Sequence, residues 1–491
     1  MGNHISLLLV VLPLMAAPLV AISPRGRTPW AIACIVAAVC AFLAATQLWM
    51  VVNHGTISYE LGGWAPPWGI EYRIDAVNAF VALIVASIAA LTLPYALLSA
   101  EQEIPADKIP LFYSALLLCL TGLLGMTQTG DIFNIFVFLE ISSLASYALI
   151  SLGKQRQALT SAYQYLIMGT IGATFYLIGV GLIYSQTGSL NMQDLEAILP
   201  GVVHLRTVET GFAFIMIGVA LKLALFPLHL WLPNAYTYAP SVVTVFLAAT
   251  ATKVAVYVLL RMLGTVFPEG FAQITPADEL LMVAGIAGIL IASVYAIYQK
   301  NVKRLLAYSS VAQVGYMALG IGLASATGVT AALVHLFNHA LMKGALFMAI
   351  GAIIYRLGAC HMEQIQGLGR MMPWTFGAIV IGGLSLVGVP GTAGFISKWY
   401  LVTAALEQQA WISVGVILAG SLLAVVYVGK LIEALYFKPT TDNGRQVTEA
   451  PLLLLVPTWA LVIANIYFGL NTELTVGIAQ QAVAILSGVM P

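Results

Sequence analysis

Residues 220–229 read Ala220-Leu221-Lys222-Leu223-Ala224-Leu225-Phe226-Pro227-Leu228-His229, which places a lysine and a proline inside an apolar run. An ionisable group at the centre of a bilayer costs about 2.5–3.5 kcal/mol on insertion scales. A proline in the middle of a helix removes one backbone hydrogen bond and kinks the helix. The stretch therefore predicts a broken membrane helix with a proton or cation site beside the break.

The composition of the whole chain agrees with a membrane protein. Of the 491 residues, 60% are hydrophobic and 8% are charged, against about 25% charged residues in soluble domains. The formal net charge is zero, so no basic surface points to a nucleic-acid partner. The four cysteines show no CxxC spacing and are interpreted as buried free thiols. We expect one polytopic unit surrounded by lipid.

Fourteen apolar runs, each long enough to cross a hydrocarbon core of ~30 Å, follow one another along the chain. They are 5–23, 29–52, 74–98, 110–128, 131–152, 161–186, 210–232, 241–264, 278–299, 303–324, 328–356, 373–403, 411–437 and 450–470. This pattern predicts an all-α polytopic fold. Between the runs, residues 53–73 predict an outer hairpin or folded loop, and residues 188–208 a short amphipathic surface helix. The tail 472–490 is expected to be an amphipathic segment lying on the membrane surface.

The distribution of positive charge predicts how the chain crosses the membrane. Connections after even-numbered runs carry only Arg73, Arg206 and Arg261. Connections after odd-numbered runs carry the larger group: Arg25, Arg27, Lys108, Lys154, Arg156, Lys300, Lys303, Arg304, Arg356, Arg370, Lys438 and Arg445. Because cytoplasmic loops are the ones enriched in Lys and Arg, both termini are predicted to lie outside.

A weak internal repeat divides the chain. Residues 142–149 resemble residues 309–319, and residues 165–169 resemble residues 339–343, each pair being five helices apart. A unit of five helices repeated in tandem must be inverted, which is a common transporter plan. We therefore expect four regions. They are an N-terminal region of residues 1–109 with outer loop 53–73, a first five-helix repeat 110–264, an inverted second repeat 278–437, and a C-terminal region of residues 450–491.

Ionisable residues inside the apolar runs are the candidate functional residues: Glu140, Lys222, Lys253, Lys343, Lys398 and Lys430. A chain keeps such groups where they face protein or water and have a partner. The run 373–403 repeats the arrangement of a lysine beside a break, because Pro390-Gly391 precedes Lys398. These two lysine-and-break segments predict a transport site at related places in the two repeats. The alternative is that the lysines extend to the helix ends.

Glu140 has no basic residue within a turn of its own helix. A buried carboxylate without a partner takes up a proton, whereas a lysine from another helix keeps it ionised. Lys222 is the natural candidate, and such a pair would couple the two protonation states. The alternative is a static ion pair that only fixes helix packing.

A central group is predicted on the run 328–356, where His335, His339 and Lys343 recur at i, i+4 and i+8. That spacing puts them on one helix face over about 12 Å. Histidine exchanges protons near neutral pH, which suits a relay together with Lys253. Structural hydrogen bonding and a metal site are the alternatives, and no further metal ligands are evident at this depth. Lys430 and Glu433 are expected to form a local ion pair.

Several long motifs carry a family resemblance. They are Phe138-Leu139-Glu140, residues 221–233 around Lys222 and Pro227, Lys303-Arg304-Leu305-Leu306-Ala307-Tyr308-Ser309-Ser310, residues 335–343 from His335 to Lys343, and Pro390-Gly391 with Lys398. With them the chain resembles the antiporter-like subunits shared by Mrp-type multisubunit cation/proton antiporters, respiratory complex I and membrane-bound hydrogenases. The outer segment 59–70 followed by Asp75 looks most like the D-type subunit of Mrp antiporters.

The resemblance implies helices four to eight and nine to thirteen as inverted repeats, with the seventh and twelfth broken. It implies Glu140–Lys222 as the pair of one half-channel, Lys253 with the histidines as the central connection, and Lys398 as the other exit. It also implies a secondary transporter subunit, not an enzyme, in a bacterial or archaeal cell membrane. That subunit would work beside other subunits and without a cofactor. We expect proton entry coupled to the export of sodium or another monovalent cation; the alternatives are a redox-driven proton pump and a scaffold.

Overall fold

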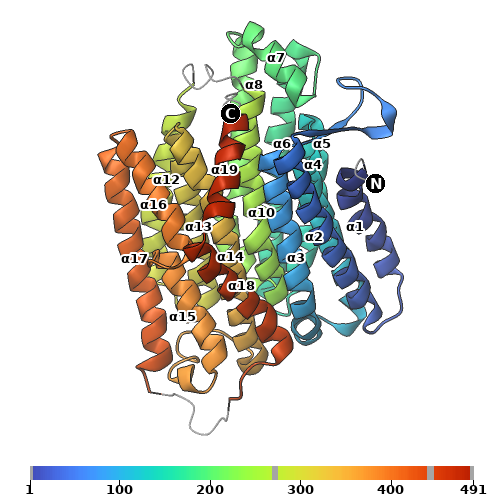
Figure 1. Ribbon diagram of the computed structural model, residues 1–491. Coiled ribbons are helices and arrows are strands. Elements are labelled where there is room, and N and C mark those ends of the chain that lie inside the picture. Colours follow the sequence, from blue (N-terminus) through green and yellow to red (C-terminus); the bar gives the residue numbers. More distant parts are fainter. Residues whose placement is uncertain (1–3, 268–274, 440–446, 487–491) are drawn as a thin grey trace.

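The computed structural model describes residues 4–267, 275–439 and 447–486, and these form one bundle of helices (Figure 1). The continuous long helices are α1 (Ile5–Ala21), α2 (Thr28–His54), α3 (Ala76–Glu103), α4 (Ile109–Gln128), α5 (Ile132–Ser151), α6 (Arg156–Thr187), α10 (Ser241–Arg261), α12 (Ala277–Ile297), α13 (Val302–Gly322), α14 (Ala326–Leu357), α17 (Trp411–Tyr436) and α18 (Leu452–Leu470). Short 3₁₀ or π turns are η2 (Leu61–Gly63), η3 (Ala106–Lys108), η4 (Met262–Val266) and η5 (Leu368–Arg370). The all-α prediction is confirmed.

Two of the expected spans are made of two helices each. The seventh consists of α8 (Arg206–Leu223) and α9 (Trp231–Tyr238), and the twelfth of α15 (Pro373–Val387) and α16 (Ala393–Glu407). In the described residues, 11 helices are long and apolar enough to cross a membrane. The two broken spans and the shorter α1 complete the fourteen expected crossings. The predicted breaks in the seventh and twelfth helices are therefore confirmed.

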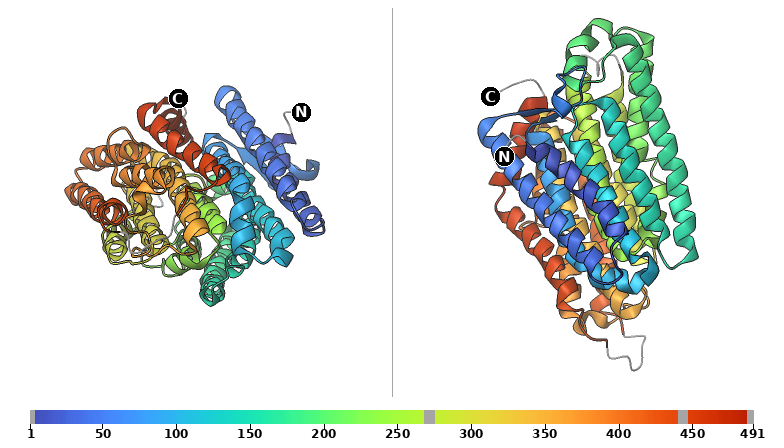
Figure 2. Two further views of the ribbon diagram at one scale, coloured as in Figure 1. Left: turned by 90° about the horizontal axis from the view of Figure 1, so that it is seen from below. Right: turned by 90° about the vertical axis from the view of Figure 1, so that its right-hand side faces the viewer.

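The two sets of five helices run in opposite directions. Helix α4 ascends in Figure 1, whereas α12, the first helix of the second set, descends. In each set the fourth span is the broken one. Seen along the bundle, the two sets stand side by side, with α1 and α2 on the outside of the first set (Figure 2). Each set thus contributes one broken span to the same bundle.

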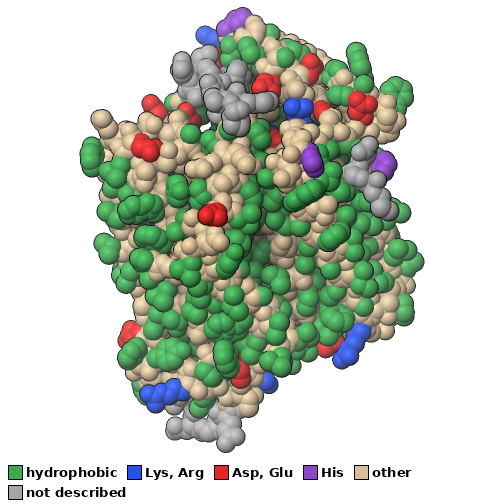
Figure 3. Space-filling model, viewed as in Figure 1, with side chains coloured by type: hydrophobic (Ala, Val, Ile, Leu, Met, Phe, Trp, Pro, Cys, Tyr) green, Lys and Arg blue, Asp and Glu red, His purple; other side chains and the backbone are tan. Residues whose placement is uncertain are grey.

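Local sequence explains where several helices start. Asp75, Asp131, Asn191, Asn301 and Ser325 each accept a backbone N–H of the first helical turn through the side chain. Such caps satisfy donors that would otherwise have no partner. On the face seen in Figure 3, the side chains along the flank of the bundle are mainly apolar, and the charged ones gather mostly toward its two ends. This arrangement suits a protein that has lipid around its flank.

Strands β1 (Ile57–Glu60) and β2 (Glu71–Ile74) form an antiparallel hairpin in which Ile57 pairs with Ile74. The hairpin is tied to the start of α5, because the Gly130 N–H donates to the Glu71 carbonyl at 2.8 Å. The short helix predicted within 188–208 is α7 (Met192–Val202), at the same end of the bundle. Both local predictions agree with the structure.

The expectation for the tail is wrong in one respect. Helix α19 (Glu473–Leu486) is amphipathic, but it stands upright in the bundle and packs against α3 and α14. Ala479 and Ala482 of this helix are fully buried. Small side chains let helix backbones approach closely. The alanine face of α19 therefore packs against neighbouring helices and not on the membrane surface.

Candidate functional site

Lys222 lies in the last turn of α8, directly before the first break. The helix ends at Leu223, and Ala224 takes a left-handed conformation with φ 58°. The buried Lys222 ammonium donates to the Ser143 hydroxyl of α5, and to the Tyr165 hydroxyl of α6 at 2.9 Å. Its partners are therefore neutral oxygens from two neighbouring helices.

Trp231 fixes the geometry of this break. Its indole N–H donates to the Leu221 carbonyl at 2.9 Å, which satisfies an acceptor left open by the end of α8. Its ring stacks on Tyr165, with centroids 3.9 Å apart and an interplanar angle of 4°. The first residue of α9 thus closes the end of α8 and holds a Lys222 partner in place.

Glu140 is half-buried on α5, one turn before Ser143. The described residues show no ion pair between Glu140 and Lys222, although their charges interact. One carboxylate oxygen of Glu140 is buried and has no hydrogen-bond partner among these residues. Glu140 is therefore a neighbour of the lysine rather than its direct partner.

The centre of the bundle holds the predicted histidine and lysine group. His335 and His339 lie on one face of α14 with parallel rings, their centroids 6.0 Å apart. Lys343, on the same helix, donates to the Leu306 carbonyl at 2.8 Å and to the Ser309 hydroxyl at 2.5 Å, both on α13. All three side chains are buried.

Lys253 on α10 completes the central group and has no exposed surface. Its ammonium donates to the Ala248 carbonyl at 2.5 Å, within its own helix. Electrostatic interactions connect His339 to Lys253 and Lys343, and His335 to Lys398. The described structure therefore brings together the central residues that the sequence singled out.

Lys398 lies at the second break but on its far side. From α16 its ammonium reaches back to the Leu386 and Val387 carbonyls of α15, at 2.8 and 2.9 Å, and to the Ser421 hydroxyl of α17 at 3.0 Å. The carbonyl end of a helix favours a cation. The two lysine-and-break segments are the fourth spans of their sets, although Lys222 precedes its break and Lys398 follows its break.

The prediction of a local ion pair between Lys430 and Glu433 is wrong. Its ammonium donates to the Ile297 carbonyl at the end of α12, at 2.8 Å. Glu433 pairs instead with Lys438, at 3.8 Å. Lys430 reaches a neighbouring helix end, where an open carbonyl accepts it.

A buried ion pair was not foreseen from the sequence. Arg261 in the last turn of α10 donates to both carboxylate oxygens of Asp75, at 2.8 and 2.9 Å, and both side chains are buried. The sequence assigns Arg261 to a connection between helices. Only its position at the end of an apolar run indicates that its side chain could be buried. The sequence does not predict Ser143 or Ser309 as a lysine partner, although each hydroxyl accepts a hydrogen bond from a lysine.

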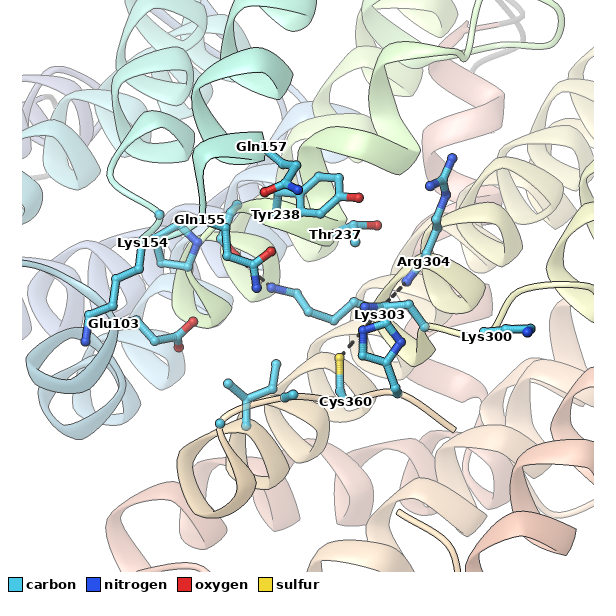
Figure 4. Close-up of a pocket in the computed structure, with 18 of the residues that line it drawn as sticks. Glu103, Lys154, Gln155, Gln157, Thr237, Tyr238, Lys300, Lys303, Arg304 and Cys360 are labelled. Atoms are coloured by element: carbon cyan, nitrogen blue, oxygen red, sulfur yellow. Dashed lines mark hydrogen bonds between the residues drawn. The ribbon is translucent and has the colours of Figure 1, made fainter. Parts of the chain in front are cut away.

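A cavity of about 720 Å³ opens between the helix connections at the end opposite to the hairpin (Figure 4). Its lining includes Glu103, Lys154, Lys303, Arg304 and Cys360. Lys303 extends across it and donates to the Ala239 carbonyl at 2.7 Å. Leu306 and Ser309, which hold Lys343, lie one to two turns further along the same helix. This polar cavity thus approaches the central group from one end of the bundle.

Comparison with known proteins gives consistent matches. Residues 129–424 match the family described as "NADH:quinone oxidoreductase/Mrp antiporter, TM". The chain is 40% identical to NADH-quinone oxidoreductase subunit N of Desulforudis audaxviator, over 98% of this chain and 99% of that protein. It is 31% identical to the D-type subunit of the Na(+)/H(+) antiporter of Alkalihalophilus pseudofirmus, over 86% and 85%.

Two solved structures are similar over almost the full length. A chain of the membrane-bound sulfane sulfur reductase, an archaeal respiratory membrane complex, matches with a TM-score of 0.90 and 33% identity, covering 99% of this chain and 98% of that one. A chain of the Mrp complex from Dietzia sp. DQ12-45-1b matches with a TM-score of 0.90 and 25% identity, covering 99% and 97%. Both neighbours are subunits of multisubunit membrane complexes.

Proposed function

This chain belongs to the NADH:quinone oxidoreductase/Mrp antiporter transmembrane family, and on that premise we propose that it moves protons across the membrane through its buried Glu, Lys and His side chains. It is a multi-pass, antiporter-like membrane subunit of the Mrp or complex I type, and it partners other subunits. The proposal concerns which residues carry the protons and what drives them.

One observation carries the proposal. The ammonium groups of Lys222, Lys253, Lys343 and Lys398 are all buried, and among the described residues none has a carboxylate within 4.0 Å. Their partners are hydroxyl and backbone carbonyl oxygens. An amine held by neutral oxygens can gain or lose a proton without breaking an ion pair. A static scaffold would instead be expected to pair such costly charges.

The proposed path orders the buried groups from one broken span to the other. Protons exchange first at Lys222, where Glu140 modulates the charge and Ser143 and Tyr165 hold the amine. They then pass through the central group of Lys253, His339, His335 and Lys343, whose charges interact. Lys398 at the second break is the other exit. Each charge that crosses the membrane is worth ~2.3 kcal/mol per 100 mV. In a redox-driven complex this energy would be stored in the proton gradient, whereas in an antiporter the gradient would supply it.

Two driving forces are candidates for the complex. The 40% identity to a quinone oxidoreductase subunit and the 33% identity to a respiratory complex chain favour redox chemistry in attached subunits. The 31% identity to a Na(+)/H(+) antiporter subunit supports sodium/proton exchange, the setting that we expected from the sequence. We place the redox-driven complex first and the antiporter second.

Substitution in the assembled complex tests the proton path. Lys222→Ala and Lys253→Ala should each abolish most proton translocation in inverted vesicles, and Glu140→Ala should reduce it. Lys430→Ala is the matched control, because among the described residues that lysine donates to the end of α12 and it lies outside the path. Normal translocation by Lys222→Ala at normal subunit levels would refute the proposal, and loss of assembly in every path variant would favour the scaffold.

The same vesicles separate the two driving forces. Acidification that requires an electron donor and is indifferent to sodium identifies the redox-driven setting. Alkalinisation caused by adding sodium to vesicles with an imposed proton gradient, without any electron donor, identifies antiport.

A further inference from the structure

Helix α18, which lies outside both repeats, touches the second break directly. A Cβ atom added to Gly469 would lie 2.4 Å from the Thr392 carbonyl carbon and 2.7 Å from the Ala393 nitrogen. The two backbones therefore meet with no room for a side chain. One turn earlier, Asn465 accepts the Ala393 N–H through its amide oxygen at 3.3 Å. Helix α18 thus contributes a polar side chain to the first turn of α16.

A second asparagine takes the other backbone group of the same residue. Asn338 of α14 donates its amide N–H to the Ala393 carbonyl at 2.6 Å. Each asparagine then retains one buried polar atom with no partner among the described residues: the Asn338 amide oxygen and the Asn465 amide nitrogen. Both side chains are only 1% exposed. One of these atoms is an acceptor and the other a donor, and a buried water molecule can satisfy either kind of group.

The two amides lie beside the proposed path. Asn338 directly precedes His339, whose two ring nitrogens also lack partners among the described residues. His335, one turn away on α14, hydrogen-bonds through Nδ1 to the Ser397 hydroxyl of α16 at 2.8 Å. His335 and the amide pair therefore contact the same short helix. The N-terminal N–H groups of that helix also favour an electron-rich oxygen.

We propose that Asn338 and Asn465 hold water against the first turn of α16, and that this water relays protons between the histidine pair and the second break. The inference rests on the proposed function and extends the path to α18. Water that accepts a proton from the histidine side releases another toward the break, so no charge accumulates. The two asparagines do not titrate and act as positioning residues.

Transport assays of the assembled complex test this role. Asn465→Leu keeps most of the side-chain volume but cannot bind water, and it should lower proton translocation about tenfold. Asn465→Ser keeps a hydroxyl and leaves room for one more water, so it should restore most of the rate. The solvent deuterium isotope effect should rise in Asn465→Leu, which a purely structural role would not produce. An unchanged rate and isotope effect would overturn the proposal.

A density map of the complex at a resolution that shows ordered water gives a second readout. In the wild type, ordered water should lie within about 3.2 Å of the Asn338 oxygen and within the same distance of the Asn465 nitrogen, and the water at position 465 should be lost in Asn465→Leu. A dry site in the wild type would also overturn the proposal.

Close packing is tested separately with two glycines. Gly469→Ala should push α18 off the break and lower translocation, whereas Gly477→Ala on α19 has nothing within 4 Å of its added methyl group and should have no effect. If Lys222→Ala stops translocation but Asn465→Leu and Gly469→Ala do not, the proposed function stands and this inference fails. If all three retain the full rate, both fail.

Discussion

Lys222 shows how a lysine can be accommodated inside the bundle without a carboxylate. Placing a lysine at mid-membrane costs about 2.5–3.5 kcal/mol. A hydrogen bond to a charged group contributes about 1.5–3 kcal/mol, so the two bonds to Ser143 and Tyr165 are of the size needed to offset that cost. Proton exchange at this amine should therefore be sensitive to each hydroxyl.

Tyr165→Phe tests that sensitivity. The ring remains stacked on Trp231, but Lys222 loses an acceptor, and we expect about a tenfold lower rate of proton translocation, equivalent to ~1.4 kcal/mol. The measurement is the initial rate in inverted vesicles at matched subunit levels. Tyr163→Phe is the control, because Tyr163 lies on the same helix and is 63% exposed. Equal rates for the two variants would show that the Tyr165 hydroxyl plays no role.

At the scale of the helix, the two breaks were the most predictable feature of the chain. A proline ring clashes with the carbonyl four residues earlier, and Leu223 stands four residues before Pro227. Helix α8 ends at Leu223, so the break starts where the proline requires and not at the proline itself. Helix α15 likewise ends at Val387, close to the residue four before Pro390. The order of Lys222 before Pro227 and of Lys398 after Pro390 already gives the side of each break on which the lysine lies. The sequence could not predict their partners Ser143, Tyr165 and Ser421, because these depend on which helices become neighbours.

Two glycines in the second break allow its conformation to be separated from its function. Gly388 and Gly391 have similar positive φ angles, 90° and 87°, so replacing either with Ala strains the backbone by about 1–2 kcal/mol. Only at Gly388 would the new Cβ also meet the Lys398 side chain, 2.9 Å from its Cδ.

Gly388→Ala should therefore reduce proton translocation at least fivefold, whereas Gly391→Ala should mainly lower thermal stability. Both quantities are measured on the purified complex, by reconstitution into vesicles and by thermal unfolding. If the two variants lose transport to the same extent, the effect comes from backbone strain and not from displacement of Lys398.

The Asp75–Arg261 pair joins α3 to the end of α10, the helix that carries Lys253. Removing one member of a buried pair leaves the other charge uncompensated and costs about 3–5 kcal/mol. Asp75→Ala should consequently lower the thermal unfolding temperature of the complex markedly. Lys438→Ala breaks the exposed pair with Glu433, and such a pair contributes about 0–1 kcal/mol to stability. Similar unfolding temperatures for the two variants would mean that the buried pair does not hold these helices together.

For the molecule as a whole, the sequence predicted which residues are unusual but not what holds them. Spacing along a helix determines how deep in the membrane a residue lies and on which helix face. Lys222, His335, His339 and Lys398 could therefore be predicted as site residues. Partners depend on which helices become neighbours, and this information is absent from local spacing. For that reason Lys430 was paired with the wrong group, the Asp75–Arg261 pair was missed, and α19 was expected on the membrane surface.

The orientation of the whole molecule is the remaining sequence prediction, and the structure makes it easy to test. The end that carries the cavity with Lys154, Lys303 and Arg304 is the positive end, and the hairpin and α7 lie at the other end. A cation near an anionic inner surface contributes about 1 kcal/mol, and cytoplasmic loops are the ones enriched in such residues. We therefore expect the cavity inside and α7 outside.

Two exposed alanines, Ala197 on α7 and Ala106 in η3, report on the two ends. In right-side-out vesicles a membrane-impermeant maleimide should label Ala197→Cys and not Ala106→Cys, and inverted vesicles should show the reverse. Background labelling should be low, because Cys40, Cys119 and Cys360 are buried and Cys34 is half-buried within α2. If the labelling pattern were opposite, the cavity beside Lys343's partners would open to the outside, and protons would have to enter the proposed path from the other end.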